Sequence, residues 1–85
     1  MKPKNTIWVK IYSPSRVYFD NVALTFSAVN DTGPFDVLPK HKNFMSLLRP
    51  CNIRVRKLDN LEFVLPISRG VLHVKQDKIT VFLDI

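Results

Sequence analysis

The chain has 85 residues, of which 46% are hydrophobic and 24% charged, and its formal net charge at pH 7 is +6. This length allows one domain with one modest core, and this composition is that of a folded globular protein rather than a disordered one. No apolar run approaches the roughly 20 residues of a membrane-spanning helix. The first residues lack the apolar stretch of a signal peptide, so a cytosolic setting is expected.

Most of the chain alternates between apolar and polar residues, which is the period-2 pattern of half-buried β-strands. Residues 44–48 fit a helix or a strand by pattern, but this apolar run is too short for a convincing helix. The alternation predicts strands over residues 7–12, 16–20, 22–29, 35–38, 44–48, 52–57, 61–65, 71–74 and 79–85.

Turn residues separate these predicted strands. The strongest turn signal is the segment Asn30-Asp31-Thr32-Gly33-Pro34, and a hairpin tip is predicted at Gln76-Asp77. Short strands spaced by turns, without a convincing helix, predict an all-β fold. We expect residues 1–85 to form a single domain, a small antiparallel β-sandwich of about eight to ten short strands.

The alternation also predicts which side chains face the core, because successive side chains of a strand point to opposite faces. The predicted inward sets are Ile7, Val9 and Ile11; Val22, Leu24, Phe26 and Ala28; Leu61, Phe63 and Leu65; and Ile79, Val81 and Leu83.

The densest basic group is Arg54-Val55-Arg56-Lys57, in which alternation places the arginines on one strand face and Ile53 and Val55 on the other. The ordinary interpretation of such a group is a solvated sheet face. Small β-barrels also bind single-stranded nucleic acid through aromatic residues flanked by basic ones, so a nucleic-acid surface remains an alternative.

Catalytic and metal chemistry is hard to build from these residues. The chain has two histidines, His41 and His73, and one cysteine, Cys51, and nothing in the sequence supports a nucleophile–base pair among them. The single cysteine excludes an internal disulfide, and no His/Cys/Asp/Glu cluster has metal-ligand spacing. We therefore expect no catalytic residue, no metal and no cofactor, and a protein that is not an enzyme by itself.

Several segments, taken in order, resemble the N-terminal β-sandwich domain of the epsilon subunit of F-type ATP synthases, which is called delta in mitochondria. The resemblance covers nearly the whole chain. The segments that carry it are Ile11-Tyr12-Ser13-Pro14 with Tyr18-Phe19, Val37-Leu38-Pro39-Lys40-His41, Phe44-Met45-Ser46-Leu47-Leu48-Arg49-Pro50, Ile67-Ser68-Arg69-Gly70-Val71-Leu72-His73-Val74, and Lys78-Ile79-Thr80-Val81-Phe82-Leu83-Asp84.

The chain also departs from the pattern of that family. Lys40 stands where a glycine usually precedes the histidine, and Arg69 replaces the first glycine of a Ser-Gly-Gly motif. Gly33-Pro34-Phe35-Asp36 stands where relatives often have Gly-Glu-Leu-Gly. The sequence ends where the C-terminal helical hairpin of the family would begin, so the resemblance implies neither the ATP sensing nor the inhibition that this hairpin performs in relatives.

The resemblance implies a non-catalytic rotor component at the foot of the central stalk, which clamps the gamma subunit and rests on the c-ring of a proton- or sodium-driven ATP synthase. It further implies a peripheral location on the cytoplasmic face of the inner (plasma) membrane, within the complex. Carried over by position, Asp31, Thr32, Gly33 and Pro34 would face the c-ring, and Ser13, Lys40, His41 and Ser46 would face gamma.

Two other functions stay open at this point. One is the basic small-barrel nucleic-acid binder described above. The other is a free adaptor, an epsilon-like sandwich that works outside the synthase.

Overall fold

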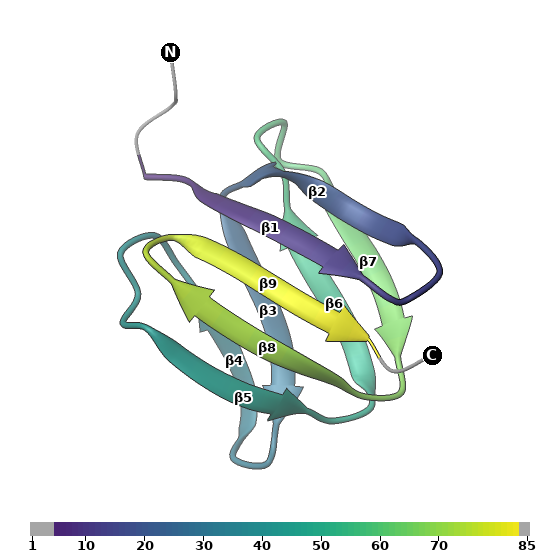
Figure 1. The fold of residues 1–85 in the computed structure, drawn as a ribbon. Helices are drawn as coiled ribbons and strands as arrows, with labels where there is room; N and C mark the ends of the chain where they lie inside the picture. Colours follow the sequence, from purple (N-terminus) through teal and green to yellow (C-terminus); the bar gives the residue numbers. More distant parts are fainter. Residues whose placement is uncertain (1–4, 84–85) are drawn as a thin grey trace.

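The computed structural model describes residues 5–83, which fold into β-strands and turns (Figure 1). This part of the chain has no helix, and therefore none that is long and apolar enough to cross a membrane. The predicted all-β class is confirmed. The strands are β1 (Ile7–Tyr12), β2 (Val17–Ala23), β3 (Thr25–Asn30), β4 (Gly33–Val37), β5 (Phe44–Leu48), β6 (Cys51–Arg56), β7 (Glu62–Ile67), β8 (Gly70–Lys75) and β9 (Lys78–Leu83).

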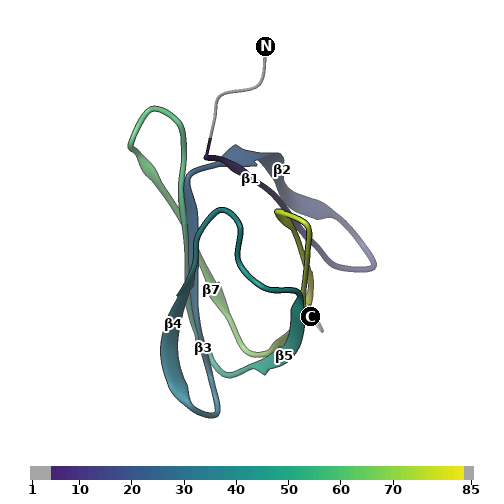
Figure 2. The same cartoon turned by 90° about the vertical axis from the view of Figure 1, so that its left-hand side faces the viewer.

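The strands form two sheets that pack face to face as a sandwich (Figure 2). One sheet has five strands in the order β2-β1-β9-β8-β5, and the other has four in the order β4-β3-β6-β7. Neighbouring strands are antiparallel, as predicted, with one exception: β1 and β9 pair in parallel. Parallel neighbours need a long connection between them, and here nearly the whole domain lies between the first and last strands.

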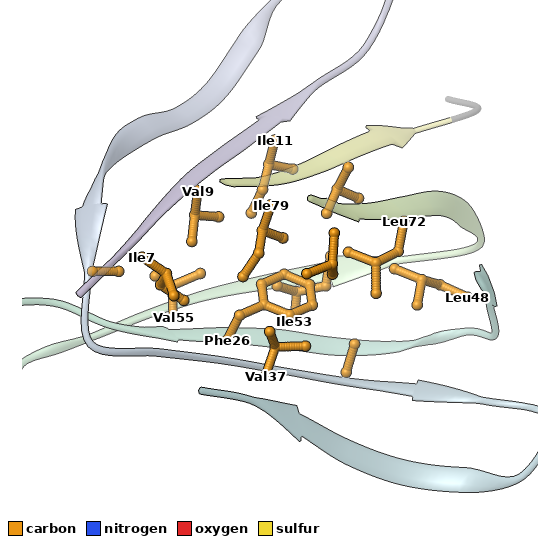
Figure 3. Packing of buried hydrophobic residues seen from close by; sticks show 14 of the residues in the cluster. Ile7, Val9, Ile11, Phe26, Val37, Leu48, Ile53, Val55, Leu72 and Ile79 are labelled. Atoms are coloured by element: carbon orange, nitrogen blue, oxygen red, sulfur yellow. The ribbon is translucent and has the colours of Figure 1, made fainter. Parts of the chain in front are cut away.

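The core lies between the sheets and is built from the inward residue of every second position. Phe26 of β3 lies at its centre and is surrounded by aliphatic side chains from both layers (Figure 3). The inward sets predicted for residues 7–11 and 79–83 are confirmed, since all six side chains are buried. The buried hydrophobic residues are Ile7, Val9, Ile11, Ala23, Phe26, Ala28, Val37, Leu48, Ile53, Val55, Ile67, Leu72, Val74, Ile79, Val81 and Leu83.

The single strand predicted over residues 22–29 is wrong, because the chain leaves one sheet and enters the other within it. β2 ends at Ala23, β3 begins at Thr25, and the Leu24 N–H donates to the Arg56 carbonyl at 2.7 Å. This change of sheet shifts the alternation by one residue. Ala23 is therefore buried where Val22 and Leu24 were expected, although Phe26 and Ala28 face the core as predicted.

The strand predicted over residues 61–65 also begins later than expected. Leu61 is 62% exposed and closes a turn, in which its carbonyl accepts the Lys57 N–H at 2.9 Å. Phe63 and Leu65 pack against the core as predicted. The strand predicted over residues 79–85 corresponds to β9, and its last two residues lie outside the described part of the chain.

The core predicts a sharp contrast between two identical substitutions. Leu72 is fully buried in β8, whereas Leu47 of the adjacent strand β5 is 70% exposed. We expect Leu72→Ala to lower the free energy of unfolding by about 2–5 kcal/mol, because it removes buried methyl groups and leaves a cavity. Leu47→Ala should stay within about 0.5 kcal/mol of the parent. Denaturant unfolding followed by circular dichroism measures both, and equal losses would contradict the sandwich core described above.

Candidate interaction surfaces

The turn between β3 and β4 is held by the side chain of Asn30. Its Oδ1 accepts hydrogen bonds from the Thr32 N–H at 3.0 Å and from the Thr32 Oγ1–H at 2.7 Å. Gly33 follows with φ at 117°, a conformation that favours glycine over other residues. The predicted tight turn is confirmed. It brings Asp31, Thr32, Gly33 and Pro34, the residues expected to face the c-ring, together at one end of the sandwich (Figure 1).

This hairpin is also tied to the opposite sheet. Asn30 Nδ2 donates to Ser46 Oγ of β5 at 3.1 Å, and the Arg49 N–H donates to the Val29 carbonyl at 2.9 Å. Asp31 and Arg49 form an ion pair at 3.4 Å. The hairpin therefore bridges both layers, and Ser46 is a structural neighbour of the hairpin.

The connection between β4 and β5 packs against the turn between β8 and β9. The Lys40 N–H donates to Asp77 Oδ1, and the Gln76 N–H donates to Asn43 Oδ1 at 2.9 Å. The ring of His41 lies beside the ring of Phe44, with 4.9 Å between centroids. Lys40 and His41 are both exposed in this connection.

Ser13 lies at the other end of the five-stranded sheet, in the turn that follows β1. It is only 5% exposed, and its N–H donates to the Arg16 carbonyl at 2.8 Å. Its Oγ lies 3.2 Å from Ser15 Oγ. A side chain this buried mainly holds the turn and offers little surface to another protein.

The four residues expected to face gamma are therefore not one cluster. Tyr12 pairs with Phe82 near the end of β9, so Ser13, the next residue, lies near that end. Lys40 contacts the turn that precedes β9. Ser13 and Lys40 are therefore separated by the length of β9. Ser46 lies on β5, an edge strand. These residues, with His41, are distributed around the border of the five-stranded sheet.

The outer face of this same sheet carries a continuous row of apolar side chains. Leu47 of β5 pairs with Val71 of β8, Val71 pairs with Phe82 of β9, and Phe82 pairs with Tyr12 of β1. The Tyr12 and Phe82 rings meet edge to face with centroids 5.2 Å apart. We call Leu47, Val71, Phe82 and Tyr12 the apolar row.

A groove of about 700 Å³ runs from the apolar row toward the β3–β4 hairpin. Leu47, Val71 and Phe82 line it together with Arg49 and Arg69. An apolar centre with a polar rim is the composition of a protein–protein interface. Only strand pairing brings these outward residues of four strands together. The one sign of this groove in the sequence is the presence of apolar residues at outward positions of β5, β8 and β9.

Residues 6–85 match the family model described as ATP synthase, Delta/Epsilon chain, beta-sandwich domain. The chain belongs to this family. It is 33% identical over 76 residues to the ATP synthase epsilon chain of Sulfurovum sp. (strain NBC37-1), a match that covers 89% of this chain and 59% of that protein. It is 29% identical over 80 residues to the ATP synthase epsilon chain of Vesicomyosocius okutanii subsp. Calyptogena okutanii (strain HA), covering 94% and 57%.

The chain thus spans less than two thirds of the length of these relatives. Two solved structures contain chains of similar fold. A chain of the Euglena gracilis mitochondrial ATP synthase, solved as OSCP/F1/c-ring in rotational state 1, superposes with a TM-score of 0.86 at 16% identity, over 92% of this chain and 50% of that one. A chain of the Tetrahymena thermophila mitochondrial ATP synthase central stalk and c-ring superposes with a TM-score of 0.75 at 15% identity, over 91% and 62%. These identities establish the fold alone.

The basic group on β6 is a paired, solvated face. Arg54 and Arg56 are exposed, and both contact the carboxylate of Glu62 on β7, at 3.2 Å and 3.7 Å. Ile53 and Val55 are fully buried on the opposite side. The predicted orientation of this strand is confirmed, and Glu62 offsets one of the two arginine charges on this face.

The histidines and the cysteine lie on separate elements. His73 is exposed on β8, His41 lies in the β4–β5 connection, and Cys51 is half-buried at the start of β6 in the other sheet. Within residues 5–83, no three or more His, Cys, Asp or Glu side chains gather as a metal site. His73 points away from the core, as its position between Leu72 and Val74 predicts.

The hairpin geometry predicts that Asn30 stabilises the turn more than the exposed ion pair does. Asn30→Ala removes three hydrogen bonds, and we expect it to cost about 1 kcal/mol and to speed amide exchange in residues 30–33. Asp31→Ala should cost less than about 0.5 kcal/mol, because the side chains of Arg49 and Asp31 are 64% and 80% exposed. Hydrogen exchange by NMR would refute this ranking if the two variants loosened the hairpin equally.

Proposed function

We propose that this chain is a non-catalytic component of the central stalk of a proton- or sodium-driven ATP synthase, in which it joins the gamma subunit to the c-ring. Membership of the Delta/Epsilon chain family supports this function. The similar Tetrahymena chain comes from a structure named for the central stalk and c-ring. The chain would lie peripherally on the cytoplasmic face of the membrane, held there by the complex.

The apolar row is the observation that carries the proposal. Leu47, Val71 and Phe82 are exposed and Tyr12 is half-buried, and together they form a contiguous band across four of the five strands of one sheet. Contiguous apolar surface of this kind marks protein contact sites, because covering it removes apolar area from water. We assign this face to gamma.

The expected gamma-facing residues agree with this assignment. Lys40, His41 and Ser46 border the five-stranded sheet, so a partner that covers its outer face would reach them at the edge. Ser13 would contribute through its turn rather than through its side chain, because that side chain is buried. We therefore propose that gamma contacts these residues along the border of the five-stranded sheet and not as one cluster.

The β3–β4 hairpin is the part that we propose to rest on the polar loops of the c-ring. Asp31, Thr32 and Pro34 are exposed there, and Gly33 shapes the turn. The bonds from Asn30 to Ser46 and from Arg49 to Val29 tie the hairpin to both sheets. A contact that carries torque must be stiff, and a close-packed sandwich with a tied hairpin supplies stiffness without chemistry.

The gamma assignment predicts an effect of one outward substitution on assembly. Leu47→Glu places a charge in the apolar row, and we expect it to reduce recovery of gamma with the tagged chain by at least about tenfold, since burying an unpaired carboxylate is costly. Val64→Glu is the matched control, because Val64 is also an exposed apolar residue but lies on the other sheet. Its gamma recovery should match that of the parent.

The same co-purification from the source cells tests the proposal as a whole. If the parent chain recovered neither gamma nor c-ring subunits, the protein would be a free adaptor and the stalk assignment would fail. If Val64→Glu abolished recovery and Leu47→Glu did not, gamma would bind the four-stranded sheet instead.

The hairpin assignment predicts a site-specific cross-link. Asp31→Cys, combined with Cys51→Ser, places a thiol on the exposed hairpin, and we expect benzophenone-4-maleimide attached to this thiol to join it to the c subunit when isolated membranes are illuminated. Asp59→Cys is the control, because Asp59 lies in the exposed β6–β7 turn, at the other end of β6 from the hairpin side. Cross-linking from Asp59→Cys alone would invert the proposed orientation of the sandwich.

A further inference from the structure

The turn between β8 and β9 and the connection between β4 and β5 bring four lysines together. Lys75 and Lys78 flank the turn, and Lys40 and Lys42 lie in the connection that is hydrogen-bonded to it through Asp77 and Asn43 (Figure 1). All four lysines are exposed. We call Lys40, Lys42, Lys75 and Lys78 the basic end.

No ion pair within residues 5–83 balances the positive charge of the basic end. Lys75 and Lys78 are directly opposite each other in the β8–β9 pair, and like charges in this position destabilise a hairpin. Residues 38–43 and 73–80 contain one carboxylate, Asp77. The ion pairs formed within residues 5–83 use Arg49, Arg54 and Arg56 and none of these four lysines.

A shallow groove of about 400 Å³ lies beside Lys75 and Lys78 on the outer face of the five-stranded sheet. Its lining consists of His73, Lys75, Gln76, Lys78 and Thr80. Thr80 lines this groove and lies two residues from Phe82 on β9, so the groove begins about 7 Å from the apolar row on the same face. One partner can therefore cover both.

We infer that the basic end binds a carboxylate-rich segment of a protein, carried by the same partner that covers the apolar row. The inference rests on the proposed function in placing that segment on gamma. Clustered lysines attract acidic surfaces and set the orientation of docking through complementary charge. Carboxylates opposite Lys75 and Lys78 would also relieve the repulsion between these two side chains.

The structure favours a protein over the other polyanions. Binding to a single-stranded nucleic acid uses open aromatic rings among the basic residues. The aromatic ring paired beside Lys78 is Trp8, whose Nε1–H donates to Asp20 Oδ1 at 2.7 Å, so a carboxylate lies next to the ring. Continuity with the apolar row is instead what a protein interface provides, with charge around an apolar centre.

The test uses deca-glutamate as the probe and the 85-residue chain labelled for NMR. At an ionic strength of about 20 mM we expect amide shift changes confined to residues 38–43 and 73–80, and weaker binding at about 200 mM. Lys75→Gln with Lys78→Gln should weaken binding about tenfold. This double variant should unfold at the same or a higher denaturant concentration than the parent, because the repulsion is gone.

The matched control is Arg54→Gln with Arg56→Gln, which removes the same charge from the other sheet. Its affinity for deca-glutamate should stay within about twofold of the parent, since screening weakens interactions with distant charges. Equal losses in the two double variants, or shift changes spread over both sheets, would overturn the inference in favour of attraction by net charge.

Two further probes decide between partner classes. A deoxythymidine decamer that bound the same residues more than tenfold tighter than deca-glutamate would overturn the inference in favour of nucleic acid. Vesicles of phosphatidylcholine and phosphatidylserine that bound the same residues more than tenfold tighter than deca-glutamate would overturn the inference in favour of a membrane surface. Weaker binding of both probes supports a protein segment.

Co-purification of gamma with the parent chain separates this inference from the proposed function. If the parent recovered gamma but did not bind deca-glutamate, the basic end would fail alone. If it bound deca-glutamate at the basic end but did not recover gamma, the proposed function would fail and the anion site would stand.

Discussion

The parallel pairing of β1 with β9 is the interaction that joins the two ends of the described chain in one sheet and completes the apolar row. It places the first and last strands side by side inside the five-stranded sheet and aligns Tyr12 with Phe82 and Trp8 with Lys78. A slip of one residue in this register would turn the inward side chains of β1 outward. The buried residues of β1 and β9 therefore fix this register, which adds Tyr12 to the apolar row. The β8–β9 pairing places Val71 and Phe82 of that row at one end of the face, and Lys75 and Lys78 of the basic end at the other.

The strands and the two hairpin turns at residues 30–34 and 76–77 could be predicted from the sequence, whereas the pairing of strands distant in the sequence could not. Alternation reports which face of a strand is apolar, and it was right for β1, β6 and β9 because these strands stay within one sheet. It failed at Leu24, where the chain changes sheets and the phase of the alternation shifts by one residue. No local pattern marks such a crossing, because the constraint comes from the strands that flank Leu24 in space.

The candidate surfaces were predictable to different extents for the same reason. The β3–β4 turn is a local structure, and its Asn-Asp-Thr-Gly sequence contains the side-chain acceptor and the glycine that the turn uses. The apolar row forms only in the tertiary structure, because Leu47, Val71, Phe82 and Tyr12 come from four different strands. The positions carried over from the family, such as Ser13 and Lys40, predicted residues at the border of the five-stranded sheet. They did not predict the apolar row on its outer face.

The ion pairs show in which parts of the fold the positive charge of the chain is offset and in which it is not. Asp31 faces Arg49 at the hairpin, and Glu62 faces both Arg54 and Arg56, so two carboxylates offset two of these three arginine charges. The lysines around the β8–β9 turn have no such partner within residues 5–83. This turn is hydrogen-bonded to the β4–β5 connection and continues directly into β9. An anionic partner bound there would therefore contact the same strands that carry the apolar row. Charge at one end and apolar area at the other would then resist rotation of the sandwich on its partner, which a single contact point could not do.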